Sequence, residues 1–262
     1  MQSRLLRGPD YPGDRLIVYC AGWGTDDAVI QHLQIPANTD VLVCWDYCDL
    51  LSCYPRRDGQ DKLASGYMHA RHSSDVSCLP LDFAFQDYTE CHLVAWSMGV
   101  WAAEQALADW PFQSACAING TPYPKHAQWG IDPEVFDATL AGLDATGRHK
   151  FERRMCSNAA QLQAYQALPA RPLDEIRAEL QAIDSSIGEE CCRVSMALVD
   201  HAANTSRPRI MWTQAIISEQ DRIIPTVHQL AYWQLHEVPI KLVAGAHYLW
   251  DGFNSWEQLC RM

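Results

Sequence analysis

Short apolar runs recur along the chain of 262 residues, and most are followed by a turn or by a segment with helical periodicity. Their apolar side chains do not alternate with polar ones, which is typical of strands buried on both faces of a sheet. These runs stand at residues 15–20, 41–45, 91–95, 114–119, 209–217 and 240–243. Helical periodicity is found at residues 25–33, 100–109, 226–236 and 253–261. This alternation predicts an α/β fold with a mostly parallel central sheet and helices on both faces.

Two segments break the alternation. Residues 131–204 are helical in period and interrupt the series of predicted strands. We therefore expect a core formed by residues 1–130 and 205–262, with a helical cap, or lid, inserted at 131–204. Residues 49–87 carry turn formers and charges, as in YPRRDGQDK, and predict an irregular excursion from the core.

Charge and composition exclude several classes of protein. The net charge of −12 and the pI near 5.2 argue against nucleic acid or an anionic membrane as partner, because both need a basic face. No segment approaches the ~18 continuous apolar residues of a membrane span, and the N-terminus has no apolar signal region, which favours a soluble, cytoplasmic protein. The eleven cysteines include no C-x-x-C pair and are expected to be reduced. We expect no metal, because no HExxH motif and no paired Cys/His spacing is present, and no cofactor.

The stretch LVAWSMGVWAAE, at residues 93–104, places one serine between a predicted strand and a predicted helix. A serine at the apex of a strand–turn–helix is the nucleophile elbow of α/β-hydrolases, usually written G-x-S-x-G. Here the pattern is Ala95-Trp96-Ser97-Met98-Gly99, with alanine at the first glycine. The alternative is that Ser97 only caps the helix that follows it.

A serine nucleophile needs a base and an orienting acid, which follow it in α/β-hydrolases in the order Asp, His. His247 directly follows the last predicted strand, after the tight exit Gly245-Ala246. Asp221 lies in the loop after the preceding strand, and one helix and one strand fit between the two residues. Glu219 is the nearest alternative acid. We therefore expect Ser97, Asp221 and His247 to form the catalytic site.

An oxyanion hole in this arrangement takes one backbone N–H from the residue after the nucleophile and one from a loop after an early strand. The first is Met98. The second is expected from the loop at residues 20–25, whose glycines let backbone N–H groups turn toward the site. Trp23 is the candidate there.

Several stretches together resemble the BioG-type pimeloyl-[acyl-carrier protein] methyl ester esterases of biotin synthesis, which are α/β-hydrolases. These stretches are YCAGWGTD, LVAWSMGVWAAE, AINGTPYP, KFERRMC, PARPLDEI and GAHYLW. The resemblance runs from about residue 15 to the C-terminus, and residues 51–82 look longer than the family's usual connection. It implies Ser97 as nucleophile, Asp221 as acid and His247 as base.

The resemblance also implies a substrate and a partner. The substrate is a methyl ester at the far end of a pimeloyl chain, held on an acyl carrier protein through phosphopantetheine. Acyl carrier proteins are acidic, so an acidic esterase needs a local basic surface to dock one. The predicted cap offers Arg148, Lys150, Arg153, Arg154, Arg171 and Arg177. The alternative is an ordinary solvated helix face with i,i+4 ion pairs.

Apolar residues of the predicted cap are candidates for the lining of an acyl-chain tunnel. These are Leu143, Phe151 and Met155, and the alternative is that each is simple core. Two further classes of function stay open. One is a related hydrolase of small esters or thioesters, because the fold does not fix the substrate. The other is a non-catalytic binding protein built on a hydrolase scaffold.

Overall fold

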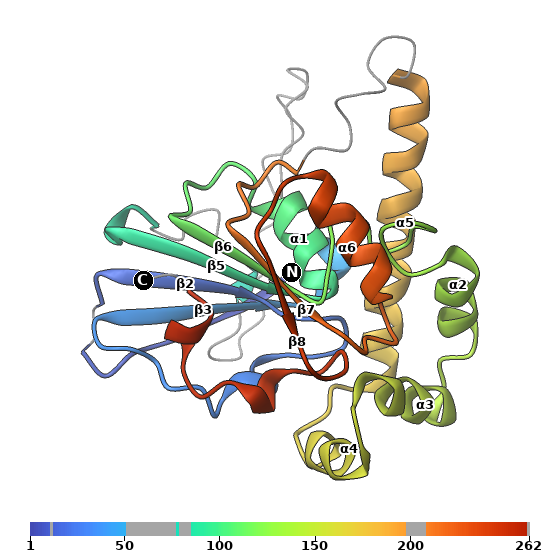
Figure 1. The fold of residues 1–262 in the computed structure, drawn as a ribbon, viewed down its shortest axis with the longest axis horizontal. Helices are drawn as coiled ribbons and strands as arrows, with labels where there is room; N and C mark the ends of the chain where they lie inside the picture. Colours follow the sequence, from blue (N-terminus) through green and yellow to red (C-terminus); the bar gives the residue numbers. More distant parts are fainter. Residues whose placement is uncertain (11–12, 51–76, 79–84, 198–207, 261–262) are drawn as a thin grey trace.

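The computed structural model describes residues 1–10, 13–50, 77–78, 85–197 and 208–260. Within these residues, eight strands form one sheet in the order β4-β1-β3-β2-β5-β6-β7-β8 (Figure 1). The strands are β1 (Gln2–Leu6), β2 (Arg15–Cys20), β3 (Thr39–Trp45), β4 (Ser77–Cys78), β5 (Glu90–Trp96), β6 (Ser114–Ile118), β7 (Gln214–Ser218) and β8 (Ile240–Val243).

The sheet is mostly parallel, as predicted. Strands β2, β3 and β5 to β8 pair in parallel, whereas β1 runs antiparallel to β3 and β4. The sequence did not predict β1 and β4. All but one residue of β1 are only half-buried, so it lacks the apolar run that marks the central strands, and β4 has only two residues.

The central strands form the core because their side chains are buried on both faces. In β2, the residues Leu16 to Cys20 are all 0% exposed, and the last five residues of β5 are buried as well. In register, Tyr19 of β2 lies beside Val94 of β5 and Val43 of β3. Cys20 and Cys44 also lie side by side, and the structure records both as free, buried thiols.

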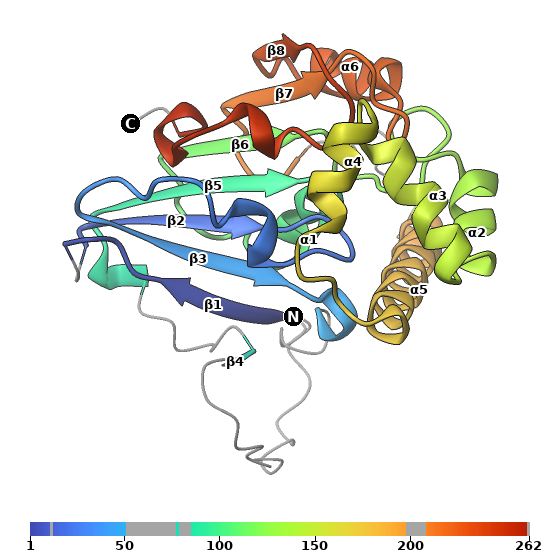
Figure 2. The ribbon, with the colours of Figure 1, turned by 90° about the horizontal axis from the view of Figure 1, so that it is seen from below.

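Helical segments cover both faces of the sheet, but they differ in kind (Figure 2). The α-helices α1 (Met98–Ala106) and α6 (Thr226–Leu235) lie on one face. The other face is covered by the short 3-10 helices η1 (Asp27–Ile30), η4 (Trp250–Gly252) and η5 (Trp256–Gln258). There the ring of Tyr19 meets those of Trp250 and Trp256 edge-on, at centroid distances of 5.2 and 5.6 Å.

The prediction of helices at residues 25–33 and 253–261 is therefore wrong in length and type, because the structure has the short 3-10 helices η1 and η5 there. After η1, the backbone N–H of Gln34 donates to Asn254 and the chain is extended through a bridge from Gln34 to Ser255. Pro36 also disfavours the α conformation at the residue before it. These contacts join the two segments to each other, so neither continues as an α-helix.

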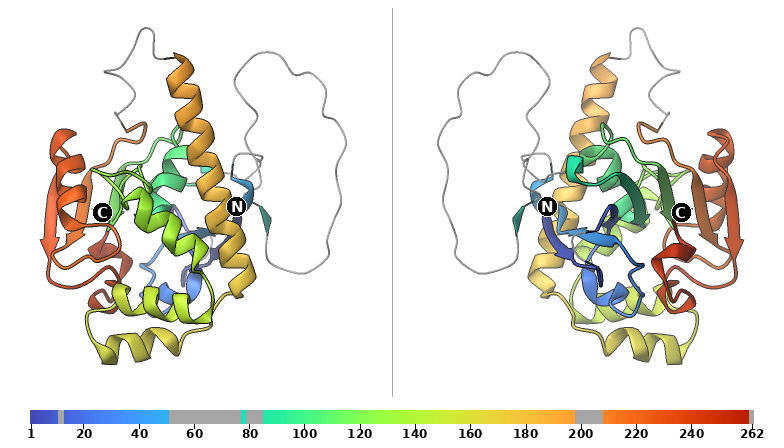
Figure 3. Two further views of the ribbon diagram at one scale, coloured as in Figure 1. Left: turned by 90° about the vertical axis from the view of Figure 1, so that its right-hand side faces the viewer. Right: turned by 90° about the vertical axis from the view of Figure 1, so that its left-hand side faces the viewer.

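Four α-helices lie between β6 and β7 in the chain and gather beyond the carboxyl ends of the parallel strands (Figures 2 and 3). Polar caps begin the first three: Asp132, Asp144 and Asn158 each accept a backbone N–H of the first turn. The helices are α2 (Pro133–Ala141), α3 (Ala145–Met155), α4 (Ala159–Gln166) and α5 (Leu173–Ala197).

Most of the predicted excursion at 49–87 lies outside the described residues. At its edges are η2 (Tyr47–Asp49), β4 and η3 (Phe85–Asp87). Among the described residues, no helix is both long and apolar enough to cross a membrane.

Candidate active site

Ser97 lies at a sharp turn between β5 and α1. Its backbone has φ 57° and ψ −124°, a conformation that L-residues rarely adopt. Its side chain makes no capping hydrogen bond to α1, so the alternative role as a helix cap does not hold. Strain of this kind persists only where the surroundings enforce it and is common at functional sites.

Close packing around the turn explains why glycine is needed at positions 99 and 120. A Cβ atom at Gly99 would lie 2.2 Å from the carbonyl oxygen of Cys20, so α1 approaches β2 backbone to backbone. A Cβ atom at Gly120 would lie 2.4 Å from the carbonyl oxygen of Ser97. Ala95 lies inside β5, where the chain is extended, so a glycine is not required at that position.

His247 lies in the loop after β8 and contacts Ser97. Its Nε2 is 2.9 Å from Ser97 Oγ, and its Nδ1 is 2.8 Å from Asp221 Oδ2. His247 is 1% exposed, Ser97 5% and Asp221 8%, so all three side chains are withdrawn from water. The structure thus brings together the three residues that order and strand ends predict.

Asp221 is held by four hydrogen bonds. Oδ1 accepts the backbone N–H groups of Ile223 and Ile224 at 2.8 and 3.1 Å. Oδ2 accepts Nε2 of Gln229 at 2.9 Å as well as contacting His247. Glu219, the alternative acid, is exposed. The carboxylate beside the imidazole is therefore that of Asp221.

Polar residues that the sequence analysis missed fix the loop of His247. Asn119 Nδ2 donates to the carbonyl oxygen of His247 at 2.8 Å and to Oγ of Ser218 at 2.7 Å. The Trp96 indole donates to the same His247 carbonyl at 3.2 Å. Asn119 directly follows the buried strand β6, at the sheet edge that carries Ser97, and this position could have identified it. Gln229 gave no such signal, because it is one polar residue within a helical pattern.

The loop after β2 brings Trp23 to the same site. Trp23 and Met98 both line a small apolar pocket between the sheet and α2, α3 and α5. Among the described residues, no acceptor is found for the backbone N–H of either residue. Met98 begins α1, where the first N–H groups have no partner within the helix. The N–H of Met98 therefore has no acceptor next to Ser97, and the N–H of Trp23 has none in a loop that lines the same pocket as Met98.

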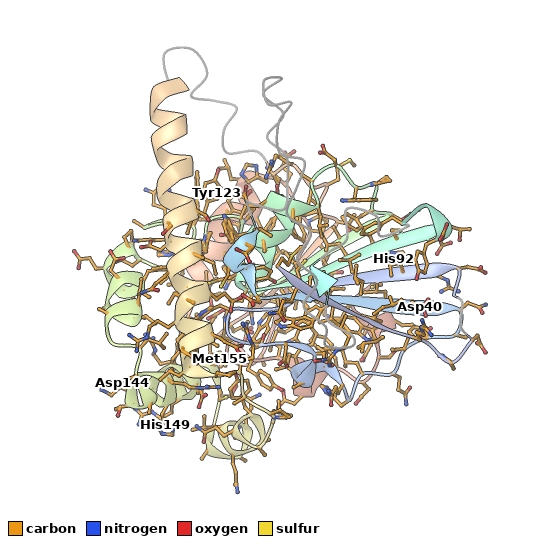
Figure 4. The ribbon with its side chains drawn as sticks, turned by 180° about the vertical axis from the view of Figure 1, so that it is seen from behind. Asp40, His92, Tyr123, Asp144, His149 and Met155 are labelled. Atoms are coloured by element: carbon orange, nitrogen blue, oxygen red, sulfur yellow. The ribbon has the colours of Figure 1, made fainter. Side chains whose placement is uncertain are left out.

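The remaining walls of this pocket come mainly from the four helices. They are formed by Ile131, Val135, Phe136, Thr139, Phe151, Arg154, Leu180 and Ile223. The ring of Phe151 meets that of Trp23 edge-on at 4.9 Å. Of the other tunnel candidates, Leu143 and Met155 are buried core residues that do not line this pocket. Figure 4 shows α3 from Asp144, on the outer side, to Met155, toward the sheet.

The six basic residues expected to bind a carrier fall into two groups. Arg171 is 6% exposed and bonds Glu179 at 2.7 Å, so the expectation of a carrier-binding surface is wrong for this residue. Arg148 donates to the carbonyl oxygen of Arg171 at 2.9 Å, and Arg177 donates to that of Leu143. These three guanidinium groups hold the helices together.

Lys150, Arg153 and Arg154 lie instead along an open groove on α2 and α3. Lys150 and Arg153 are exposed, whereas Arg154 is half-buried and also lines the apolar pocket. Burial lowers the pKa of the Arg154 guanidinium from its ordinary value. The groove and the pocket therefore share one cationic residue. Within the residues that the structure covers, no cluster of His, Cys, Asp or Glu suited to a metal ion is found.

Comparison with known proteins decides the family. The model of the family described as "Pimeloyl-ACP methyl esterase BioG" matches residues 7–71 and 65–259. The chain belongs to this BioG family. A crystal structure of BioG from Haemophilus influenzae is 35% identical, has a TM-score of 0.77 and is matched over 99% of each chain.

Two curated proteins are also similar to this chain. An uncharacterized protein of Haemophilus influenzae is 36% identical, over 95% of this chain and 96% of the relative. A malonyl-[acyl-carrier protein] O-methyltransferase of Bacteroides fragilis is 33% identical, over 88% of this chain but only 39% of that longer protein. From its family and its fold, this BioG chain is an α/β-hydrolase.

Proposed function

We propose that this protein is a serine esterase that hydrolyses the methyl ester of a pimeloyl chain held on an acyl carrier protein, in biotin synthesis. The observation that carries the proposal is the continuous hydrogen-bonded series from Ser97 through His247 to Asp221, beside the apolar pocket of Trp23 and Met98. Membership of the BioG family supports the choice of ester and of carrier.

In the first half-reaction, Ser97 Oγ attacks the ester carbonyl carbon while His247 Nε2 takes the hydroxyl proton. Asp221 accepts a hydrogen bond from the Nδ1–H group of His247 and stabilises the imidazolium. The N–H groups of Trp23 and Met98 stabilise the oxyanion, at about 2.7–4 kcal/mol for each donor. The C–O bond to the methoxy group breaks, and His247 returns the proton so that methanol leaves.

In the second half-reaction, water hydrolyses the acyl-enzyme. His247 takes a proton from the water, whose oxygen attacks the acyl carbon. The bond to Ser97 Oγ then breaks, and His247 returns the proton to the serine. The product is pimeloyl-carrier protein with a free carboxylate, and the enzyme is regenerated.

The proposed docking surface for the acidic carrier consists of Lys150, Arg153 and Arg154, on the α3 side of a groove that Asp132, Glu134 and Asp144 also line. Opposite charges raise the association rate and fix the orientation of the complex. Val135, Thr139 and Arg154 line both this groove and the apolar pocket, so the groove leads toward Met98. In this proposal residues 131–204 act as the cap, and residues 1–130 and 205–262 as the catalytic core.

The test compares three esters with the same enzyme. The kcat/KM of the carrier-linked pimeloyl methyl ester is measured beside those of dimethyl pimelate and p-nitrophenyl acetate. The proposal predicts that the carrier-linked ester has the highest value and that Ser97→Ala abolishes turnover of all three. A higher value for the free esters favours a general esterase instead, and residual turnover by the variant contradicts the role of Ser97.

A further inference from the structure

Helix α5 carries a fully buried carboxylate that contacts the loop after β2. Glu179 is 0% exposed. Its Oε2 accepts the backbone N–H of Gly24 at 3.2 Å and Nη1 of Arg171 at 2.7 Å. Its Oε1 accepts the backbone N–H of Tyr47 at 3.2 Å. This residue does not touch Ser97, His247 or Asp221, yet it bonds the peptide that follows Trp23.

Other hydrogen bonds hold the same loop. The Trp23 indole donates to the carbonyl oxygen of Ile176, also on α5, at 2.7 Å. The Tyr47 hydroxyl donates to the carbonyl oxygen of Ala21 at 2.6 Å. Gly24 has φ +73°, which allows the chain to turn directly after Trp23. The loop is thus fixed on both sides of the Trp23 backbone N–H.

We infer that Glu179 is a positioning residue, which holds the peptide between Trp23 and Gly24 so that the Trp23 N–H serves as an oxyanion donor. The inference rests on the proposed function, because only an oxyanion gives that N–H a role. Oxyanion donors are effective when they are oriented before the reaction. A bond to the Gly24 N–H fixes the plane of the peptide next to the donor and limits rotation about the Trp23 backbone.

A carboxylate suits this position better than an amide. Two backbone N–H groups and one guanidinium converge on Glu179, and an ionised carboxylate accepts from all three. A glutamine side chain has one acceptor oxygen, and its NH2 group can only donate. A protonated glutamate likewise carries a hydrogen on one of its two oxygens. At least one of the three bonds must then weaken: either the bond to Tyr47, or the bonds to Gly24 and Arg171, which share the other oxygen.

The charged side chains around Glu179 are those of Arg171 and of two acids that lie near Arg171. Arg171 faces it directly, Asp46 lies 3.7 Å from Arg171 and Glu175 lies 3.9 Å from Arg171. Burial raises the pKa of Glu179 to about 6, and Arg171 and the two backbone N–H groups oppose that rise. Cys48 and Tyr47 are further titratable neighbours; burial raises the pKa of the Cys48 thiol to about 12 and that of the Tyr47 hydroxyl well above its ordinary value. Glu179 is therefore ionised at about pH 8 and mostly protonated at about pH 5.

The test uses Glu179→Gln and hydrolysis of p-nitrophenyl acetate, which needs no carrier. At about pH 8, kcat should fall about tenfold, a fraction of the loss on removing a donor outright, with KM within about twofold of wild type. At about pH 5, the two kcat values should converge, because wild-type Glu179 is then neutral as well. Any pH dependence that both proteins share cancels in the ratio of their kcat values.

The matched control is Asp184→Asn, on the same helix. Asp184 is half-buried and bonds Lys125 at 2.8 Å, away from the loop of Trp23. Its kcat ratio to wild type should stay near one at every pH. Equal kcat for Glu179→Gln and wild type at about pH 8 would overturn the inference. A reduced ratio that stays constant from about pH 5 to 8 would do so too, because a purely structural defect does not depend on this ionisation.

Loss of the glutamate charge leaves buried Arg171 with only the longer ion pairs to Asp46 and Glu175, at 3.7 and 3.9 Å, which can prevent folding. In that case the double variant Glu179→Gln/Arg171→Gln removes both charges, and the same pH ratio applies to it. The Ser97→Ala variant separates the two proposals. If it retains turnover, the proposed function fails, whereas an inactive Ser97→Ala with a pH-independent Glu179→Gln ratio rejects the positioning role alone.

Discussion

Asp221 Oδ2 lies 2.8 Å from His247 Nδ1, although 26 residues separate the two in the chain. Each follows a different strand, β7 or β8, and these strands pair in parallel. The carboxyl ends of neighbouring parallel strands meet at one sheet edge, which is why loops distant in sequence supply one site. The other bonds of Asp221 fix its carboxylate, so the imidazole has one orientation.

Asp221→Asn should therefore lower kcat by about 10⁴-fold with little change in KM, because the amide favours the wrong imidazole tautomer. Steady-state kinetics on the carrier-linked ester measure this. The control is Glu219→Gln, an exposed acid on the same loop, which should keep wild-type kcat. Near-normal activity of Asp221→Asn, or a large loss in the control, would assign the acid elsewhere.

Lys150→Glu/Arg153→Glu should raise KM for the carrier-linked ester about tenfold or more and leave kcat for p-nitrophenyl acetate unchanged. Added salt should raise the wild-type KM in the same direction, since exposed charges are screened beyond about 8–10 Å. The matched control is Lys241→Glu, on β8 and also exposed. Equal effects on both substrates would mean that the groove residues stabilise the fold and do not bind the carrier.

Gly99→Ala should destabilise the protein by about 3 kcal/mol, because the new methyl group would lie 2.2 Å from the carbonyl oxygen of Cys20. Urea denaturation monitored by tryptophan fluorescence measures the free energy of unfolding. Gly252→Ala is the control, since nothing lies within 4 Å of a Cβ atom there. A free energy equal to that of the control would show that α1 and β2 separate at little cost.

Asn119→Ala should lower the free energy of unfolding by about 2–3 kcal/mol more than Asn38→Ala. Both asparagines have a positive φ, 45° and 54°, so the backbone strain of the substitution is common to the two. Only Asn119 is buried, and its amide bonds Ser218 and the carbonyl oxygen of His247. Equal losses for the two variants would show that these hydrogen bonds add no net stability.

The sequence predicts the central strands and the residues at their ends because buried parallel strands leave continuous apolar runs. Ser97, Asp221 and His247 each follow such a run, so their meeting point follows from topology. The half-buried strand β1 leaves no such run and was missed. The segments around η1 and η5 show helical periodicity, but a long-range bridge from Gln34 to Ser255 overrides it.

The cap shows where local reasoning about charge fails. Six basic residues look alike in the sequence, yet Arg171 is buried against Glu179 whereas Arg153 is exposed. Only the packing of α5 against η2 and the loop after β2 separates these two cases. Glu179 itself was not predicted, because its partners Gly24 and Tyr47 lie more than 130 residues away.

The most direct measurement incubates the protein with pimeloyl-carrier protein methyl ester and records the intact mass of the carrier over time. The account predicts conversion of one methyl ester to one acid, with an equal amount of methanol, and no conversion by Ser97→Ala or Asp221→Asn at matched times. An unchanged carrier mass with the folded wild-type protein would contradict it. So would a loss of the whole acyl chain, which would indicate cleavage of the thioester in place of the methyl ester.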